Sequence, residues 1–153
     1  RMIRLSYRPA SPTGRLALVG KGIMYDSGGI ALKPADAVHA QMKNDMSGAA
    51  AVVAAMSVLR EVGCRSEVTA YVMCTDNMPS GTAMALGDVI TIRGGKTVEV
   101  INTDAEGRLI LADGIVLATP PAHHAPATLD LVGRGFHVFV EKPMATRVAS
   151  IRS

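Results

Sequence analysis

Two short charged runs interrupt an otherwise apolar chain, and each directly follows a β-branched, apolar segment that predicts a buried strand. The first run spans residues 21–29 and is followed by Lys33 and Asp45, and the second spans residues 102–109. Charged groups at strand ends in such a chain usually face a cleft, because burying them unpaired costs several kcal/mol. The two runs therefore predict one shared site at the edge of a sheet.

Strand patterns alternate with helix patterns along the chain, which predicts an α/β fold with a mixed, partly parallel sheet flanked by helices. Small residues on every side of the first helix predict burial on several of its faces. In such sheets the ligand crevice lies beyond the carboxyl ends of the strands, where both charged runs begin. The expected strands are 2–7, 15–20, 67–75 and a hairpin of 88–93 with 97–102, and the expected helices are 47–62 and 107–118.

Composition narrows the class of protein. The 153 residues are 48% hydrophobic, which is enough for one globular domain with a real core. No apolar run approaches the ~20 residues of a membrane span, and no signal segment opens the chain, so we expect a cytoplasmic protein with no membrane partner. The basic residues are scattered, which does not favour a nucleic-acid partner. Residues 22–130 hold seven basic and twelve acidic side chains, a balance that suits a cation site.

The acidic side chains of the two runs predict a metal centre. Asp104 and Glu106 are two residues apart, so in an extended loop both carboxylates project to one side. With Asp26 and Asp45 the local charge reaches −4, which two divalent cations would cancel. Two-metal centres hold their ions roughly 3.5–4 Å apart and suit the hydrolysis of amides and phosphates. Oxygen ligands point to Mn, Mg or a carboxylate-held Zn, and Lys21 could join only as a neutral amine.

Two further cations, Lys33 and Arg108, could stabilise an oxyanion beside such a centre. Taken one at a time, all these residues have ordinary structural roles as well. Asp26 and Asp45 suit turns or helix caps, Lys33 suits a solvated loop, and Arg108 suits an exposed helix face. The residues alone therefore leave the function open between a two-metal hydrolase, of amides or of phosphates as in a phosphatase, and a non-catalytic fragment that binds metal or assembles with partner chains.

Four sequence blocks in order, together with their spacing, closely resemble the leucyl aminopeptidase (cytosol aminopeptidase) family. They are residues 19–35, 42–50, 77–81 and 102–109. The last block, Asn-Thr-Asp-Ala-Glu-Gly-Arg-Leu, is specific to that family. The resemblance covers about residues 1–131 and implies the first half of a catalytic domain, so the expected fold is an incomplete aminopeptidase domain.

The resemblance implies a role for each charged residue. Two divalent ions, Mn or Zn, would be held by five side chains: Lys21, Asp26, Asp45, Asp104 and Glu106. All of these except Asp104 would hold the tighter ion, and the exchangeable ion would bind Asp26, Asp104 and Glu106. Lys33 would polarise the peptide carbonyl, and Arg108 would hold a bicarbonate that acts as general base.

The family also implies a substrate and an assembly. Its members release N-terminal residues, often Leu, from peptides by means of a metal-bound water, and they form hexamers. They carry a domain ahead of this region and a substrate-binding segment after it. We therefore expect a peptide substrate and a homo-oligomer, with activity impaired if those parts are missing.

The end of the chain departs from this family. Residues 133–145 resemble the Glu-Lys-Pro strand of the glucose–fructose oxidoreductase/inositol dehydrogenase family, although an unrelated strand and turn would give the same pattern. Gly133 and Gly135 belong to a run that lacks the third glycine of a dinucleotide site, so an oxidoreductase activity is not predicted. We expect a partial metalloaminopeptidase domain over 1–131 and a divergent tail over 132–153.

Overall fold

A four-stranded mixed sheet forms the centre of the molecule. The computed structural model describes residues 1–118 and 138–139. The strands lie in the order β1 (Met2–Tyr7), β3 (Glu67–Asn77), β2 (Arg15–Asp26) and β6 (Val138–Phe139). β1 is antiparallel to β3, whereas β2 runs parallel to both β3 and β6. The predicted α/β class with a partly parallel sheet is confirmed.

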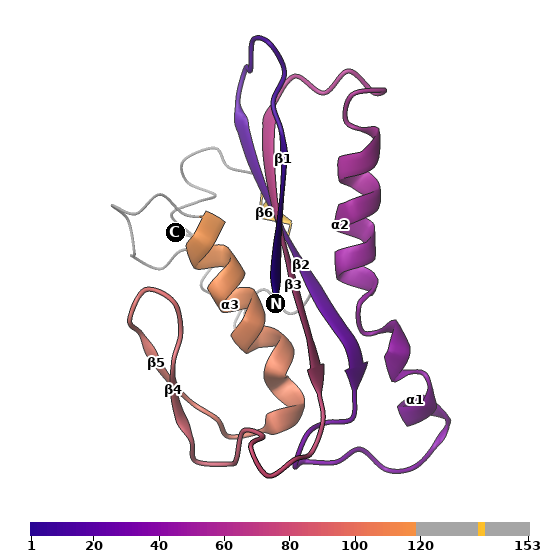
Figure 1. Cartoon of the computed structure of the whole chain (residues 1–153), viewed down its shortest axis with the longest axis vertical. Helices are drawn as coiled ribbons and strands as arrows, with labels where there is room; N and C mark the ends of the chain where they lie inside the picture. Colours follow the sequence, from indigo (N-terminus) through magenta and orange to yellow (C-terminus); the bar gives the residue numbers. More distant parts are fainter. Residues whose placement is uncertain (119–137, 140–153) are drawn as a thin grey trace, which may run out of the picture.

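Two helices cover opposite faces of this sheet (Figure 1). On one face, α2 (Ser47–Val58) buries Val52 against Val72 of β3. On the other face, α3 (Glu106–Ala118) buries Leu111 against Val19 of β2. The core therefore consists of two thin apolar layers, one on each side of the sheet. Within the described residues, no helix is long and apolar enough to cross a membrane.

The prediction that the first helix is buried on several faces is wrong for the described part of the chain. Only Gly48, Ala49 and Val52 of α2 are buried, and the side chains of Val53 and Val58 are 47% and 41% exposed. The reason is geometric, because the sheet covers a single side of the helix and a helix presents only one stripe to a flat neighbour. The helix also ends at Val58, four residues earlier than expected.

Glycines in β2 allow α2 to lie directly on the strand. A Cβ atom at Gly20 would lie 2.8 Å from Ala49 Cα and 3.1 Å from the Gly48 carbonyl oxygen. A Cβ atom at Gly22 would lie 2.8 Å from the Met73 carbonyl oxygen. These neighbours are backbone atoms that cannot swing aside, those at Gly20 in α2 and that at Gly22 in β3. A Cβ atom at Gly22 would also lie 3.3 Å from the Ala49 Cβ of α2, so α2 packs closely on the strand at both positions.

Gly20→Ala should therefore lower the free energy of unfolding by about 1–3 kcal/mol, the usual cost of overpacking a core. Thermal unfolding followed by circular dichroism measures the effect. Gly81→Ala is a matched control, since a Cβ atom at Gly81 meets nothing within 4 Å. Equal melting temperatures for the two variants would contradict this account of the packing.

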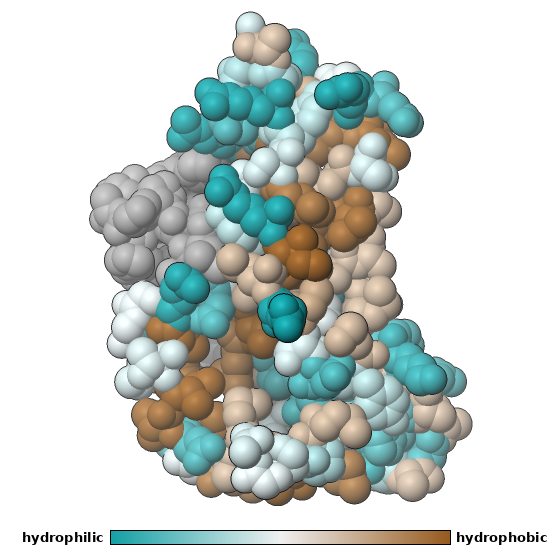
Figure 2. All heavy atoms as spheres, viewed as in Figure 1, coloured by the Kyte–Doolittle hydropathy of each residue, from teal (hydrophilic) through white to brown (hydrophobic). Residues whose placement is uncertain are grey.

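The predicted hairpin forms a second, two-stranded sheet beside α3. β4 (Val89–Thr91) pairs antiparallel with β5 (Thr97–Glu99), so both strands are shorter than expected. Gly94 and Gly95 have φ of +92° and +87°, which accounts for the glycine pair at the turn. Figure 2 shows hydrophobic surface over this hairpin, where Val89 is 65% exposed.

Short helical turns connect the main elements near the charged runs. The sequence patterns did not predict α1 (Ala37–Ala40) or the 3₁₀ turn η1 (Met42–Asn44), which lie between β2 and α2. A third turn, η2 (Thr103–Ala105), leads directly into α3. The predicted domain division at 131/132 lies outside the described residues, as does the predicted tail except for β6.

Candidate metal centre

An irregularity in β2 decides where Asp26 points. The strand continues to Asp26, six residues beyond its predicted end, so Lys21 and Asp26 lie within it rather than after it. Ile23 pairs with Thr75, but Asp26 pairs with Asn77, so β2 contains one residue more than β3 over this stretch. Such a bulge reverses the alternation of side chains beyond it. Asp26 therefore shares the α3 face of the sheet with Lys21.

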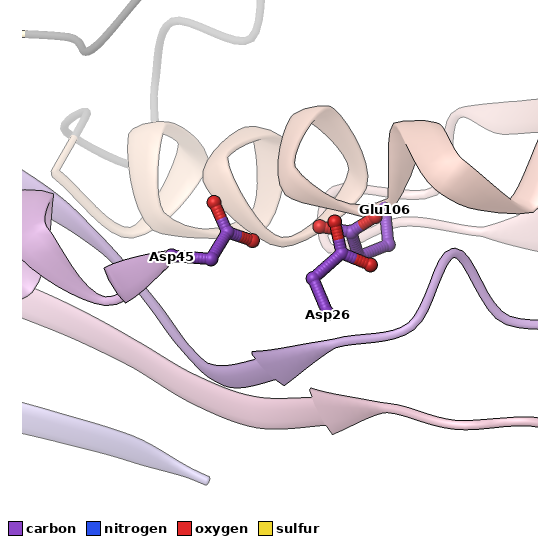
Figure 3. A group of neighbouring side chains, drawn as sticks. All are labelled: Asp26, Asp45 and Glu106. Carbon is purple, nitrogen blue, oxygen red and sulfur yellow. The ribbon is translucent and has the colours of Figure 1, made fainter. Parts of the chain in front are cut away.

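Three of the predicted ligands come together at this end of the sheet. Asp26, Asp45 and Glu106 each offer a carboxylate oxygen, and these oxygens all lie within 4.8 Å of one another (Figure 3). Asp26 ends β2, Asp45 immediately follows η1, and Glu106 is the first residue of α3. The cluster thus forms from three segments far apart in the sequence, at the carboxyl end of the parallel β2–β3 pair.

Lys21 neutralises part of this cluster. Its Nζ lies 2.7 Å from Asp45 Oδ2 and 3.1 Å from Glu106 Oε1. Burial lowers the pKa of Lys21, but the hydrogen bond to Asp45 and the charge of Glu106 outweigh it, so the pKa is raised. A Cβ atom at Gly107 would lie 2.7 Å from Lys21 Cε, which explains why a glycine opens the first turn of α3.

Lys33 neutralises part of the charge of a second pair of carboxylates, Asp26 and Asp104. Its ammonium lies 3.1 Å from Asp26 Oδ2 and also forms an ion pair with Asp104 Oδ1. Burial lowers the pKa of Lys33, but hydrogen bonds to Asp104 and Asp26 raise it by more. Lys33 thus lies between the two carboxylates, and within the described residues Asp104 is not part of the three-carboxylate cluster.

Asn77 is a residue of the site to which the sequence patterns assigned no role. The side chain is 7% exposed, and its Nδ2 lies 2.8 Å from Asp26 Oδ1, 3.1 Å from Glu106 Oε2 and 2.9 Å from the Thr103 carbonyl oxygen. The available signal was a polar amide at the end of a buried strand, inside one of the four family-like blocks. Strand-end amides are common in turns, so that signal was not distinctive.

A threonine fixes the loop that carries Lys33. The Thr103 hydroxyl donates to the Gly28 carbonyl at 2.7 Å and accepts from the Ala31 amide at 2.8 Å. Gly28 has φ of +89°, and a Cβ atom there would lie 2.5 Å from the Ala31 carbonyl oxygen. The loop after β2 is therefore held against η2, which brings Lys33 to Asp104. Sequence patterns gave Thr103 no role either.

The cluster suits a divalent cation. Asp45 Oδ2 and Glu106 Oε1 are buried oxygens that face the Lys21 ammonium, at 2.7 and 3.1 Å. Burial raises the pKa of Glu106, and Lys21 offsets only part of this shift. Burial also raises the pKa of Asp26, but bonds from Gly28, Asn77 and Lys33 lower it by more. Carboxylate oxygens gathered in a confined space are the ligands that hard cations such as Mn²⁺ and Mg²⁺ take.

Arg108 lies apart from these contacts. It is exposed on the first turn of α3, two residues after Glu106. Its side chain makes no hydrogen bond or ion pair with the part of the chain that the structure describes. The predicted bicarbonate site at Arg108 therefore remains a prediction.

Comparison with known proteins gives one consistent result. The family model described as the catalytic domain of the cytosol aminopeptidase family matches residues 1–132. A probable cytosol aminopeptidase of Leifsonia xyli subsp. xyli is 55% identical over 118 residues, which cover 77% of this chain and 24% of that protein. A probable cytosol aminopeptidase of Micrococcus luteus is 49% identical over 131 residues, which cover 86% of this chain and 25% of that protein.

Solved structures agree with this result. The leucyl aminopeptidase of Trypanosoma brucei in complex with bestatin superposes with a TM-score of 0.74 at 43% identity, over 77% of this chain and 23% of that one. The bottromycin maturation enzyme BotP in complex with Mn superposes with a TM-score of 0.73 at 39% identity. The match covers 88% of this chain and 31% of that one. The chain spans about a quarter of the length of the curated relatives described here. It belongs to the cytosol aminopeptidase family, as part of the catalytic domain.

Proposed function

We propose that this chain supplies the metal centre of a two-metal aminopeptidase that releases N-terminal residues, such as Leu, from peptides. The observation that carries the proposal is the cluster of Asp26, Asp45 and Glu106, whose carboxylate oxygens lie within 4.8 Å of one another. Membership of the cytosol aminopeptidase family supports it. So do a relative in complex with Mn and another in complex with bestatin.

The proposed ligands divide between two ions, Mn or Zn. Four side chains hold the tighter ion: Lys21, Asp26, Asp45 and Glu106. Three hold the exchangeable ion: Asp26, Asp104 and Glu106. The first set contains the three clustered carboxylates together with the lysine that contacts two of them. The second set surrounds the Lys33 ammonium, which pairs with two of its members.

The chain's own residues then act on the peptide. Two bound divalent ions supply Lewis-acid polarisation and activation of the attacking water. Lys33 is a catalytic residue in this proposal, because it donates a hydrogen bond to the carbonyl oxygen of the scissile peptide as negative charge develops there. To do so, its ammonium would have to leave Asp104, whose carboxylate would then be available to hold the exchangeable ion. Arg108, exposed two residues after Glu106, would hold a bicarbonate, which would supply the general base for the attacking water.

The partners and location proposed for the whole protein are a peptide substrate, further copies of the same chain, and the cytoplasm. Homologues named cytosol aminopeptidase support the location. Apolar side chains exposed on α2, such as Val53 and Val58, favour self-association of the chain.

An assay of two chains tests the proposed activity. With Mn²⁺, the 153-residue chain should bind metal but cleave leucine anilide slowly, because holding the substrate in a reactive geometry contributes roughly 7–11 kcal/mol and needs a formed pocket. A chain extended by the family's remaining C-terminal elements should cleave it at a much higher rate.

Nitrophenyl phosphate is the discriminating control substrate. Preferential cleavage of the phosphate ester by the extended chain would favour another two-metal hydrolase. Metal binding without cleavage of either substrate by the extended chain would favour a non-catalytic fragment. Either result would contradict the aminopeptidase proposal.

A further inference from the structure

We infer that Asn77 is a positioning residue of the metal centre, whose side-chain amide holds Asp26 and Glu106 so that one oxygen of each carboxylate is directed at the cations. The inference rests on the proposed function, in which these two carboxylates serve both ions. Asn77 itself contacts neither an ion nor a substrate in this role. It acts through the two side chains that do.

The geometry divides the oxygens of each carboxylate between two kinds of partner. Asn77 Nδ2 lies 2.8 Å from Asp26 Oδ1 and 3.1 Å from Glu106 Oε2. The opposite oxygens face cations instead, with Asp26 Oδ2 3.1 Å from Lys33 Nζ and Glu106 Oε1 3.1 Å from Lys21 Nζ. One amide nitrogen thus contacts both carboxylates, and at Asp26 Oδ1 the Gly28 amide joins it at 2.9 Å. Among the described residues, the printed partner of each cation-facing oxygen is a lysine.

An amide is the side chain that this position requires. Its NH₂ group offers two hydrogens and stays neutral, so it can bond two ionised carboxylates together. A carboxylate at the same place would repel both, and an apolar side chain would remove a donor from each, leaving Asp26 Oδ1 with the Gly28 amide at 2.9 Å, which is costly. The carbonyl of Thr103, 2.9 Å from Nδ2, is a third acceptor, so the two hydrogens are shared among three oxygens.

Asn77 is in turn held rigidly. Its main-chain carbonyl oxygen accepts hydrogen bonds from the Ser27 main-chain amide at 2.9 Å and from the Ser27 hydroxyl at 2.6 Å. A Cβ atom at Gly29, where φ is +65°, would lie 2.8 Å from Asn77 Oδ1. The loop after β2 therefore closes over the amide and leaves it little room to rotate. A rigid donor is what orientation of metal ligands demands.

Metal binding to the 153-residue chain tests the inference. Asn77→Ala should weaken Mn²⁺ binding, measured by calorimetry, by about 10–100-fold, the usual effect of losing a hydrogen-bond partner of a ligand. The visible absorption spectrum of the Co²⁺-loaded chain should also change, because that spectrum reports the arrangement of the ligands. Both readouts use the metal ion alone, without substrate.

Val68→Ala is the matched control. Val68 is fully buried near the other end of β3, nine residues from Asn77, which is about 30 Å along a strand. It should lower the melting temperature without altering Mn²⁺ affinity or the Co²⁺ spectrum. Wild-type affinity and spectrum in Asn77→Ala would overturn the inference, and so would equal losses of Mn²⁺ affinity in the two variants.

Asn77→Ser covers the case in which Asn77→Ala does not fold. A serine hydroxyl has a single hydrogen and can serve only one carboxylate, so its Mn²⁺ affinity should also fall below that of the wild type. Unchanged affinity in this variant would overturn the inference. The proposed function fails differently, because a wild-type chain that takes up no metal contradicts it and the Asn77 role together. Metal uptake without peptide cleavage by the extended chain contradicts the aminopeptidase alone.

Discussion

Glu106→Gln is expected to abolish the uptake of both metal ions by this chain. The proposed ligand sets share Glu106, so a single change removes one carboxylate from each. The loss of Mn²⁺ affinity should exceed the roughly 10–100-fold that follows from removing a hydrogen-bond partner of a ligand, because here a ligand itself is lost. Calorimetric titration with Mn²⁺ measures the affinity and the number of ions bound.

The control for this change is Glu99→Gln. Glu99 is an exposed acid in β5, and its replacement removes the same charge from the same chain. It should leave both affinities unchanged, which separates the loss of a ligand from a general loss of negative charge. If Glu106→Gln still bound two ions with wild-type affinity, the assignment of Glu106 to either ion would be wrong.

Lys33→Met is expected to have two opposite effects, since it should tighten the exchangeable ion while abolishing peptide cleavage by the extended chain. The Lys33 ammonium lies between Asp26 and Asp104, two of the three proposed ligands of that ion. At an effective dielectric constant of about 20, a unit charge at 4 Å contributes ~4 kcal/mol. The Lys33 side chain is 18% exposed, so solvent screens part of this. If the loss of the ammonium charge changed the binding free energy by only about a third of this ~4 kcal/mol, the affinity for the exchangeable ion would still rise roughly tenfold.

Lys96→Met is the matched control, because Lys96 is an exposed lysine in the hairpin turn and carries the same charge. It should change neither the affinity for Mn²⁺ nor the rate of cleavage of leucine anilide. Weaker binding of the exchangeable ion in Lys33→Met would show that Lys33 supports that ion rather than competing with it. Retained cleavage would remove Lys33 from the reaction.

Local patterns were sufficient for most of the sheet and for bringing together three of the four predicted acids, without Asp104. The alternation in 2–7 and the glycine pair at 94–95 depend on neighbours in sequence, and both predicted elements are present. The resemblance to the aminopeptidase family rested on short blocks in a fixed order, which the match over residues 1–132 confirms. Asp26, Asp45 and Glu106 were predicted to share a site, and their oxygens do gather.

The missed features depend on contacts across the chain. Asn77 and Thr103 are ordinary polar residues until the fold surrounds them with carboxylates and loop amides from segments that lie 26 to 75 residues away. The burial of the helix at 47–62 was overestimated because small apolar residues permit close packing without supplying the neighbour that would cover them. The length of β2 was underestimated because glycines at 20 and 22 suggested a loop, whereas they serve the approach of α2.

The bulge near the end of β2 means that the site depends on how many residues the strand contains as well as on which ones. Side chains alternate between the two faces of a sheet, so every residue beyond an added or lost position changes face. If the same residues continued as a regular strand without the bulge, the apolar core would be kept, but Asp26 would fall one position beyond the partner of Asn77 and its carboxylate would point toward α2. The sheet would then still form, but Asp26 would lie on the opposite face from Lys21 and the metal site would be lost. No substitution at a ligand position has this effect.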